Sequence, residues 1–180
     1  MSIYGGKELA SSFRTVRKNT IQVAEDIPES KYDFVAAPGT RSVAEQLKHI
    51  AFAPSLFEEM HREKKLKTLQ GYDFPGFMAR ANAADKVKRT KAEIVASLKS
   101  DGERFAAWMD TLTPEFLAET YTDPMGQNPK TRFESLHSPK EHEMHHRAQL
   151  MLIERILGIT PHLTRQMEER MRARAKAGAG

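Results

Sequence analysis

Apolar residues recur at intervals of three and four along four stretches of the chain, and proline and glycine gather between these stretches. Such spacing places apolar side chains on one face of a helix, so each stretch predicts an amphipathic α-helix. The first helix is expected from about Lys7 to Asp26, and Pro28 ends it. The face that it would bury carries Leu9, Phe13, Val16, Thr20 and Val23.

The second helix is predicted to begin after Ser42 and to continue to about Lys64. A Pro-Gly pair in the preceding stretch 36–40 indicates a loop. Ser42 with Glu45 three residues later is the pattern of a capping box. Pro54 falls inside the helix, where its ring removes one backbone donor and crowds the preceding turn. We therefore expect a kink at Pro54.

The third helix is predicted over about 84–110. Glycine and proline leave the stretch before it, 67–82, without a predicted element. A connection over 111–137 follows the third helix, and a short helix is expected within it at 114–119. Connections of this length are uncommon in compact bundles and often carry function.

The fourth helix has the clearest predicted boundaries. Ser138 is expected to cap it, with Pro139 in the first turn and Glu141 completing the Ser-x-x-Glu pattern. The helix should run to Leu157, because Gly158 suits a left-handed C-terminal stop. No stretch predicts a β-strand. The chain is therefore predicted to be all-α, a four-helix bundle with a long connection between its third and fourth helices.

Length and charge limit the remaining possibilities. The 180 residues fit a single helical-bundle domain over 1–161, followed by a basic C-terminal extension over 162–180 that is expected to be partly flexible. Much of the net charge of +4 comes from this extension, so nucleic acid is not an expected partner.

No run of the sequence approaches the ~18 apolar residues of a membrane span. We expect a cytoplasmic protein with no membrane partner. The absence of cysteine excludes disulfides and thiolate metal sites.

Three of the seven histidines fall within residues 142–146, inside the fourth predicted helix. At about 100° per residue, His146 lies about 40° from His142 and Ile153 about 20° from it. Both rings therefore point along the apolar stripe, whereas His145 lies on its flank. Two imidazoles one turn apart on a buried face can bind one metal ion, which compensates their desolvation.

A third ligand is expected from a facing helix. His49 lies in the middle of the second predicted helix, at the border of its apolar face. We therefore predict a divalent metal ion bound by His49, His142 and His146. Three neutral imidazoles leave coordination positions open, which is typical of a reactive site rather than a structural one. Zinc or nickel is expected, with iron and manganese as alternatives.

The other histidines are expected to have ordinary structural roles. His61 lies in a charged stretch and is expected on the surface, His137 precedes the cap of the fourth helix, and His162 follows that helix. His145 is a fallback ligand or a neighbour of the ligands.

Three segments resemble the DinB-like family: KYDF at 31–34, the stretch 37–50 around His49, and SPKEHEMHHRAQL at 138–150. The last is the most specific, because it joins the histidine pair to Arg-x-Gln. Ala148 departs from the glycine of many relatives, and alanine is the better helix former. The resemblance implies a four-helix bundle, commonly a homodimer, with a three-histidine metal site at the positions reached above.

The DinB-like family includes DNA-damage-inducible proteins and metal-dependent transferases that use thiols such as bacillithiol, mycothiol or glutathione. The first hypothesis is therefore a metal-dependent thiol S-transferase, whose partners are a low-molecular-weight thiol and an electrophilic small molecule. Arg41, Arg132 or Arg147 would hold a carboxylate of the thiol. Likeness of fold does not decide whether the chain is an enzyme.

Two further hypotheses remain open. Metal-dependent hydrolysis is compatible with the His142-Glu143-x-x-His146 spacing, although nothing else in the chain suggests a peptidase. A non-enzymatic, stress-related metal-binding protein would use the same ligands only for stability.

Two glutamates are candidates for orienting the ligand histidines. Glu143 or Glu45 would do so, with the capping box as the simpler role for Glu45.

Overall fold

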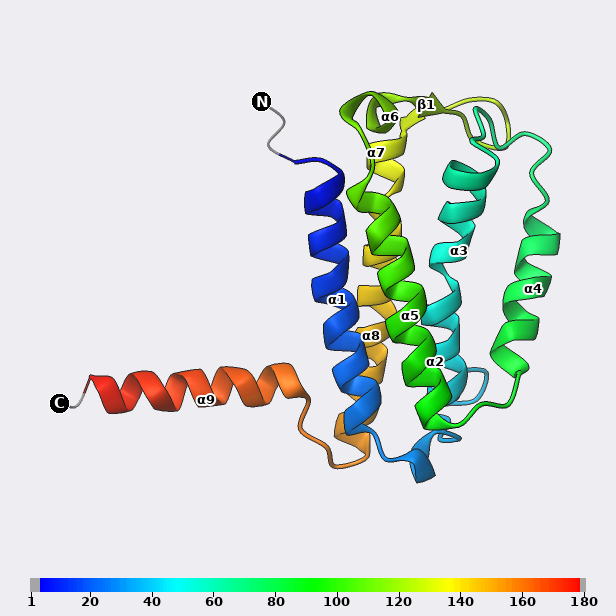
Figure 1. The fold of residues 1–180 in the computed structure, drawn as a ribbon. Helices are drawn as coiled ribbons and strands as arrows, with labels where there is room; N and C mark the ends of the chain where they lie inside the picture. The colour runs from blue at the N-terminus through cyan, green and yellow to red at the C-terminus, as the bar shows by residue number, and fades with distance from the viewer. Residues whose placement is uncertain (1–3, 179–180) are drawn as a thin grey trace.

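Residues 4–178 are described by a computed structural model (Figure 1). Four long helical segments form a bundle in which the first and the second each pack on the third and the fourth. This arrangement confirms the predicted all-α four-helix bundle. The segments are α1 (Gly6–Asp26), α2 (Val43–Phe52) continued by α3 (Pro54–Phe57) and η2 (Glu58–Glu63), α5 (Lys91–Asp110), and α8 (Ser138–Ile156). A short 3-10 helix, η1 (Glu29–Lys31), follows α1.

The predicted apolar faces form the core. In one cluster, Leu47 of α2 packs with Leu98 of α5 and Leu150 of α8. In another, the rings of Phe13 on α1 and Phe105 on α5 meet edge to face with centroids 5.1 Å apart. The buried positions of α1 include the whole predicted face: Leu9, Phe13, Val16, Thr20 and Val23.

The second helical segment begins as predicted and is interrupted at the position where a kink was expected. The backbone N–H of Glu45 donates to Oγ of Ser42 (3.2 Å), and that of Ser42 donates to Oε2 of Glu45 (3.0 Å), which completes the capping box. The helix is interrupted before Pro54, where α3 begins, and its last part is the π-helical segment η2. His49 therefore lies within the regular part of the segment.

The stretch left without a predicted element contains a helix, α4 (Phe74–Lys86), which packs on the outside of α2 (Figure 1). Asp73 caps it, because its Oδ1 accepts a hydrogen bond from the backbone N–H of Gly76 at 2.8 Å. Pro75 lies in the first turn, where the missing backbone donor has no cost. The proline and glycine therefore mark the start of a helix rather than its absence.

The predicted start of the third helix at residue 84 is wrong, because residues 84–86 belong to α4. Helix α5 begins at Lys91, after a capping box of Thr90 and Glu93. The backbone N–H of Glu93 donates to Oγ1 of Thr90 at 3.2 Å.

The long connection between α5 and α8 contains the predicted short helix, α6 (Pro114–Ala118), and another, α7 (Arg132–Ser135). The expectation of no strand is wrong, since β1 (Thr120–Tyr121) pairs antiparallel with β2 (Lys130–Thr131). Each strand has two residues, too few for an alternating pattern to be detected in the sequence.

His61 is buried beneath the long connection between α5 and α8, and not on the surface as predicted. The π-helical turn lets both Met60 and His61 face inward. Nη1 of Arg132 donates to Nδ1 of His61 (2.8 Å), so the ring proton stays on Nε2, which donates to Oγ of Ser135 (2.8 Å). Because Nε2 is the donor, His61 cannot act as a base on Ser135, and the network ties the long connection to η2.

Helix α8 starts differently from the prediction at Ser138. His137 is the N-cap residue and has no side-chain capping bond, because α7 leads into α8 with His137 already in helical conformation (φ −74°, ψ −32°). At the other end, Gly158 has φ +77° and follows the helix as predicted.

A buried ion pair determines which face of α8 points toward α1. Nε of Arg17 donates to both carboxylate oxygens of Glu143 at 3.0 Å, and Nη1 donates to the backbone oxygen of Leu98 at 2.9 Å. The guanidinium thus joins α1, α5 and α8. Because Glu143 follows His142 directly, this pair also fixes the direction of the neighbouring histidines.

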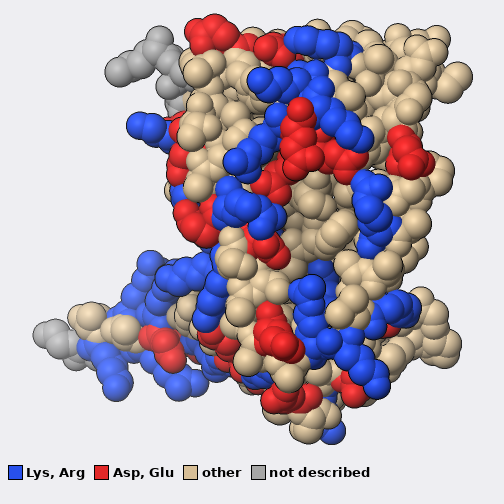
Figure 2. Space-filling model, turned by 45° about the vertical axis from the view of Figure 1, so that its right-hand side comes forward, with Lys and Arg blue, Asp and Glu red and all other residues tan. Residues whose placement is uncertain are grey.

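Helix α9 (His162–Ala177) leaves the bundle at the end opposite α6 and α7 and projects away from it (Figure 1). Basic side chains gather along this helix, whereas basic and acidic side chains alternate over the visible face of the bundle (Figure 2). The flexibility expected of the extension stays a prediction, and its residues 179–180, like residues 1–3 of the predicted domain, lie outside the described range. Between residues 4 and 178, no helix has the length and apolarity needed to cross a membrane.

Candidate metal centre

The three histidines predicted as ligands meet between α2 and α8. His49 comes from α2, and His142 and His146 lie one turn apart on α8. Nε2 of His142 lies 3.1 Å from Nε2 of His49 and 3.2 Å from Nε2 of His146. The side chain of His49 is 12% exposed, so this group is largely shielded from solvent.

The spacing of these nitrogens suits a metal ion. With a Zn–N distance of about 2.0–2.1 Å and tetrahedral angles, two ligand nitrogens lie roughly 3.3 Å apart. The observed separations of 3.1 and 3.2 Å are close to this value. The group meets the geometric requirement for holding one ion, and three imidazoles leave at least one coordination position open.

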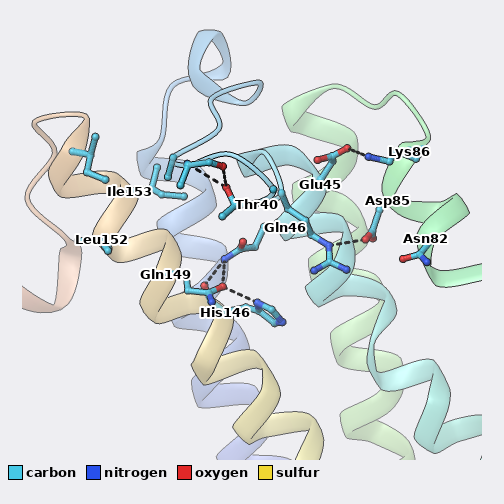
Figure 3. A pocket seen from close by; sticks show the side chains of 15 residues that line it. Thr40, Glu45, Gln46, Asn82, Asp85, Lys86, His146, Gln149, Leu152 and Ile153 are labelled. Atoms are coloured by element: carbon cyan, nitrogen blue, oxygen red, sulfur yellow. Dashed lines mark hydrogen bonds and ion pairs between the residues drawn. The ribbon is translucent and has the colours of Figure 1, made fainter. Parts of the chain in front are cut away.

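Two glutamines orient the ring of His146 (Figure 3). Oε1 of Gln149 accepts hydrogen bonds from Nδ1 of His146 and from Nε2 of Gln46, both at 2.9 Å. Gln46 also donates to the backbone oxygen of His146 at 2.9 Å. A proton on Nδ1 leaves the lone pair on Nε2, so His146 is held in the tautomer that metal coordination needs.

Burial keeps the three rings neutral. It lowers the pKa of His49 to about 3 and that of His142 to about 4, and the positive charge of Arg41 acts in the same direction on both. The pKa of His146 is lowered too, again mainly by burial. Neutral imidazole is the form that binds metals. Within the described part of the chain, the buried Nδ1 atoms of His49 and His142 have no hydrogen-bond partner.

A carboxylate from α4 lies beside His49. Oδ2 of Asp85 is 3.7 Å from Nδ1 of His49 and accepts a hydrogen bond from Nε of Arg41 at 2.8 Å. Asp85 was not among the predicted site residues, because α4 was not predicted. The available signal was Asp73 as a cap, followed by Phe77, Ala81 and Asp85 at spacings of four.

A sequence model of the DinB superfamily matches residues 12–150. The chain belongs to the DinB superfamily. No curated protein sequence matches this DinB chain.

Solved structures share the fold of this DinB protein. YfiT from Bacillus subtilis, described as a probable metal-dependent hydrolase with an unusual four-helix bundle topology, is 17% identical, with a TM-score of 0.67 over 89% of this chain and 91% of YfiT. The DinB-like protein YjoA of Bacillus subtilis is 25% identical, with a TM-score of 0.63 over 85% and 93%. An uncharacterized protein from Clostridium difficile 630 is 16% identical, with a TM-score of 0.66 over 87% and 99%.

The two glutamates considered as orienting groups in this DinB chain have other partners. Glu143 is bound by Arg17 in the core. Glu45 closes the capping box and pairs with Lys86 at 2.5 Å. His145 is exposed and lies beside the site, with Nε2 3.1 Å from Nε2 of Gln149.

The three candidate arginines have different surroundings. Arg132 is fully buried in the network of His61. Arg147 donates to the backbone oxygen of Val16 on α1 at 3.3 Å. Arg41 lines a cavity that also contains His146. Of the three arginines, only Arg41 is therefore placed to meet a small molecule at the DinB histidines.

This cavity has a volume of about 730 Å³ and two unlike walls. Figure 3 shows Leu152 and Ile153 on α8 at one side and Asn82 and Lys86 on α4 at the other. His146 lies between the two walls. The cavity suits a small molecule with one apolar part and one polar or charged part.

Proposed function

We propose that this DinB protein is a metal-dependent enzyme in which His49, His142 and His146 hold a divalent ion, zinc or nickel, and that it transfers a low-molecular-weight thiol to an electrophilic small molecule. The observation that supports this most is the convergence of one ring nitrogen from each of the three histidines within 4.8 Å of one another, at the edge of a cavity.

A divalent ion with open coordination positions lowers the pKa of a bound thiol and so supplies thiolate at neutral pH. The protein's own residues then have three tasks: they hold the ligand rings, bind the thiol compound and bind the electrophile. Gln46 and Gln149 perform the first task for His146.

The cavity walls divide the other two tasks. Arg41 uses Nε for Asp85, and its side chain is 32% exposed, so its remaining N–H groups are available to a carboxylate of the thiol compound. Leu152, Ile153 and Ile156 form an apolar wall for the electrophile.

A thiol nucleophile agrees with the state of the acidic side chains. Glu143 is held by Arg17 in the core, and Glu45 is paired with Lys86, so neither carboxylate is free to act as a general base. A thiol needs no protein base once its pKa is lowered, whereas activation of water commonly uses one.

Metal-dependent hydrolysis is the second candidate. It is favoured by the open coordination position and by the likeness to YfiT, described as a probable metal-dependent hydrolase. Exposed His145, whose ring centroid lies 5.0 Å from that of His146, would be the base in that case.

The test begins with elemental analysis of the purified protein. Metal-loaded protein is then assayed with a chromogenic aryl halide and several biological thiols, and separately with a chromogenic ester in the absence of thiol. We expect thiol conjugation that His142→Ala abolishes together with metal binding, and that Arg41→Met reduces through a higher KM for an anionic thiol. Ester hydrolysis without thiol dependence would support the second candidate, and metal binding without either activity would support a non-enzymatic role.

A further inference from the structure

The face of α4 that packs on α2 ends in a carboxylate. Phe77, Ala81 and Asp85 are the buried residues of α4 and follow one another at spacings of four, so they lie on one face. Phe77 packs against Phe52 with ring centroids 5.6 Å apart. Asp85 is 4% exposed, although an apolar residue would be expected at the end of such a face.

The buried carboxylate is only partly satisfied by its arginine. Arg41 donates to Oδ2, while Oδ1 has no hydrogen-bond partner among residues 4–178. Nδ1 of His49, which also has no hydrogen-bond partner in the described range, lies 3.7 Å from Oδ2 of Asp85. The buried carboxylate of Asp85 and the buried ring of His49 thus lie side by side, and each has one polar atom without a partner, which is unusual because buried polar groups are nearly always paired.

We propose that Asp85 is the positioning residue for His49: its carboxylate accepts the hydrogen bond of Nδ1–H and so directs the lone pair of Nε2 toward the metal. This inference rests on the metal centre proposed above. Gln149 does the same for His146, where the hydrogen bond is already formed. A carboxylate behind a ligand imidazole fixes its tautomer and raises its basicity, and loss of such a partner typically weakens metal binding by about 10–100-fold.

A purely structural role would give a different pattern of effects. If Asp85 only anchored α4 through Arg41, then removing either partner of the ion pair would weaken the site to the same extent. If Asp85 acts on His49, the two removals have opposite effects. Asp85→Ala removes the acceptor and a negative charge, whereas Arg41→Met leaves Asp85 free for His49 and removes a positive charge that repels the metal ion.

The experiment measures Zn²⁺ affinity by competition with a chelating dye and records the visible absorption spectrum of the Co²⁺-loaded full chain. We expect Asp85→Ala to weaken Zn²⁺ binding by about 10–100-fold and to change the Co²⁺ spectrum. Asp85→Asn should weaken binding less, because its amide oxygen can still accept one hydrogen bond. Arg41→Met should bind as tightly as the wild type or more tightly. Asn82→Ala, one turn earlier on the same helix and also lining the cavity, is the matched control and should leave both readouts unchanged.

Circular dichroism of the metal-free variants shows whether each one folds. If Asp85→Ala does not fold, the comparison is made with Asp85→Asn. Wild-type affinity in a folded Asp85 variant overturns the inference and leaves the metal centre standing. Equal weakening by Arg41→Met and Asp85→Ala also overturns it, in favour of an anchor for α4. A wild-type chain that binds neither Zn²⁺ nor Co²⁺ overturns the inference and the proposed function together.

Discussion

Glu154 on α8, which is influenced by the charges of Asp26 on α1 and Arg165 on α9, offers a quantitative test of the packing. Its side chain is fully buried, and neither carboxylate oxygen has a hydrogen-bond partner in the described range. Burial raises its pKa from 4.5 to about 7. Asp26 adds to this effect, while Arg165 and Arg155 oppose it. Glu154 is therefore a carboxyl group that the native protein keeps protonated to higher pH than the unfolded chain does.

The sign and size of the effect follow from these two pKa values. Native Glu154 binds its proton more tightly than unfolded Glu154, so the free energy of unfolding falls as pH rises from 4.5 to about 7 and then levels off. Each pH unit between the two values is worth about 1.4 kcal/mol. The total penalty at neutral pH is thus on the order of 3 kcal/mol. Glu154→Gln removes this titration, and any packing cost of the buried amide is the same at every pH.

The assay is urea denaturation of metal-free protein, with unfolding monitored by circular dichroism. It is repeated at several pH values, from below pH 4.5 to above pH 7. The stability of Glu154→Gln relative to the wild type should rise by about 3 kcal/mol across this range. Subtracting the stability of the wild type from that of the variant cancels the contribution of the buried histidines, because they titrate alike in both proteins. Glu169→Gln on the exposed side of α9 is the control and should run parallel to the wild type. Parallel curves for Glu154→Gln would refute the argument.

The other predictions concern the bundle core and the metal ligands. Arg17→Met leaves Glu143 buried without a partner and should lower the free energy of unfolding by about 3–5 kcal/mol, measured by urea denaturation. The double variant Arg17→Met/Glu143→Leu should recover much of that loss. A double variant no more stable than the single one would contradict this. Gln149→Leu removes the acceptor of His146 and should weaken Zn²⁺ binding by about 10-fold with little change in stability, since Gln149 is exposed. Zinc at about 100 times its Kd should stabilise the wild type by about 2.7 kcal/mol, measured as a higher Tm, and should not change the Tm of His142→Ala.

The sequence predicted those parts of the structure that local helix geometry controls. The positions of His142 and His146 follow from about 100° per residue once α8 is recognised, and the apolar stripe shows which way they face. His49 follows from its place in a helix with a recognisable capping box. The three rings meet as expected, because an amphipathic helix in a bundle has only one face to bury.

The parts that were missed depend on tertiary contacts or on competing local signals. Asp85 lies far from His49 in the sequence and reaches it only through α4, whose Pro75 and Gly76 resembled a break. His61 lies in a charged run, and only the π-helical turn and Arg132 place it inside. At Ser138, a good capping sequence is overridden because α7 already directs the chain into the helix. In each case, partners distant in sequence decide between local alternatives.

The spacing His142-Glu143-x-x-His146 shows why a ligand pattern does not by itself define the chemistry. In a zinc peptidase, the acid after the first histidine acts as the general base. Here the rotation of α8 that points His142 and His146 toward α2 turns Glu143, about 100° away, toward α1. There Arg17 holds both of its carboxylate oxygens. Freeing Glu143 for catalysis would leave a buried arginine unpaired, at a cost of about 3–5 kcal/mol. Glu143 is therefore not available as the general base that the spacing of the ligands suggests.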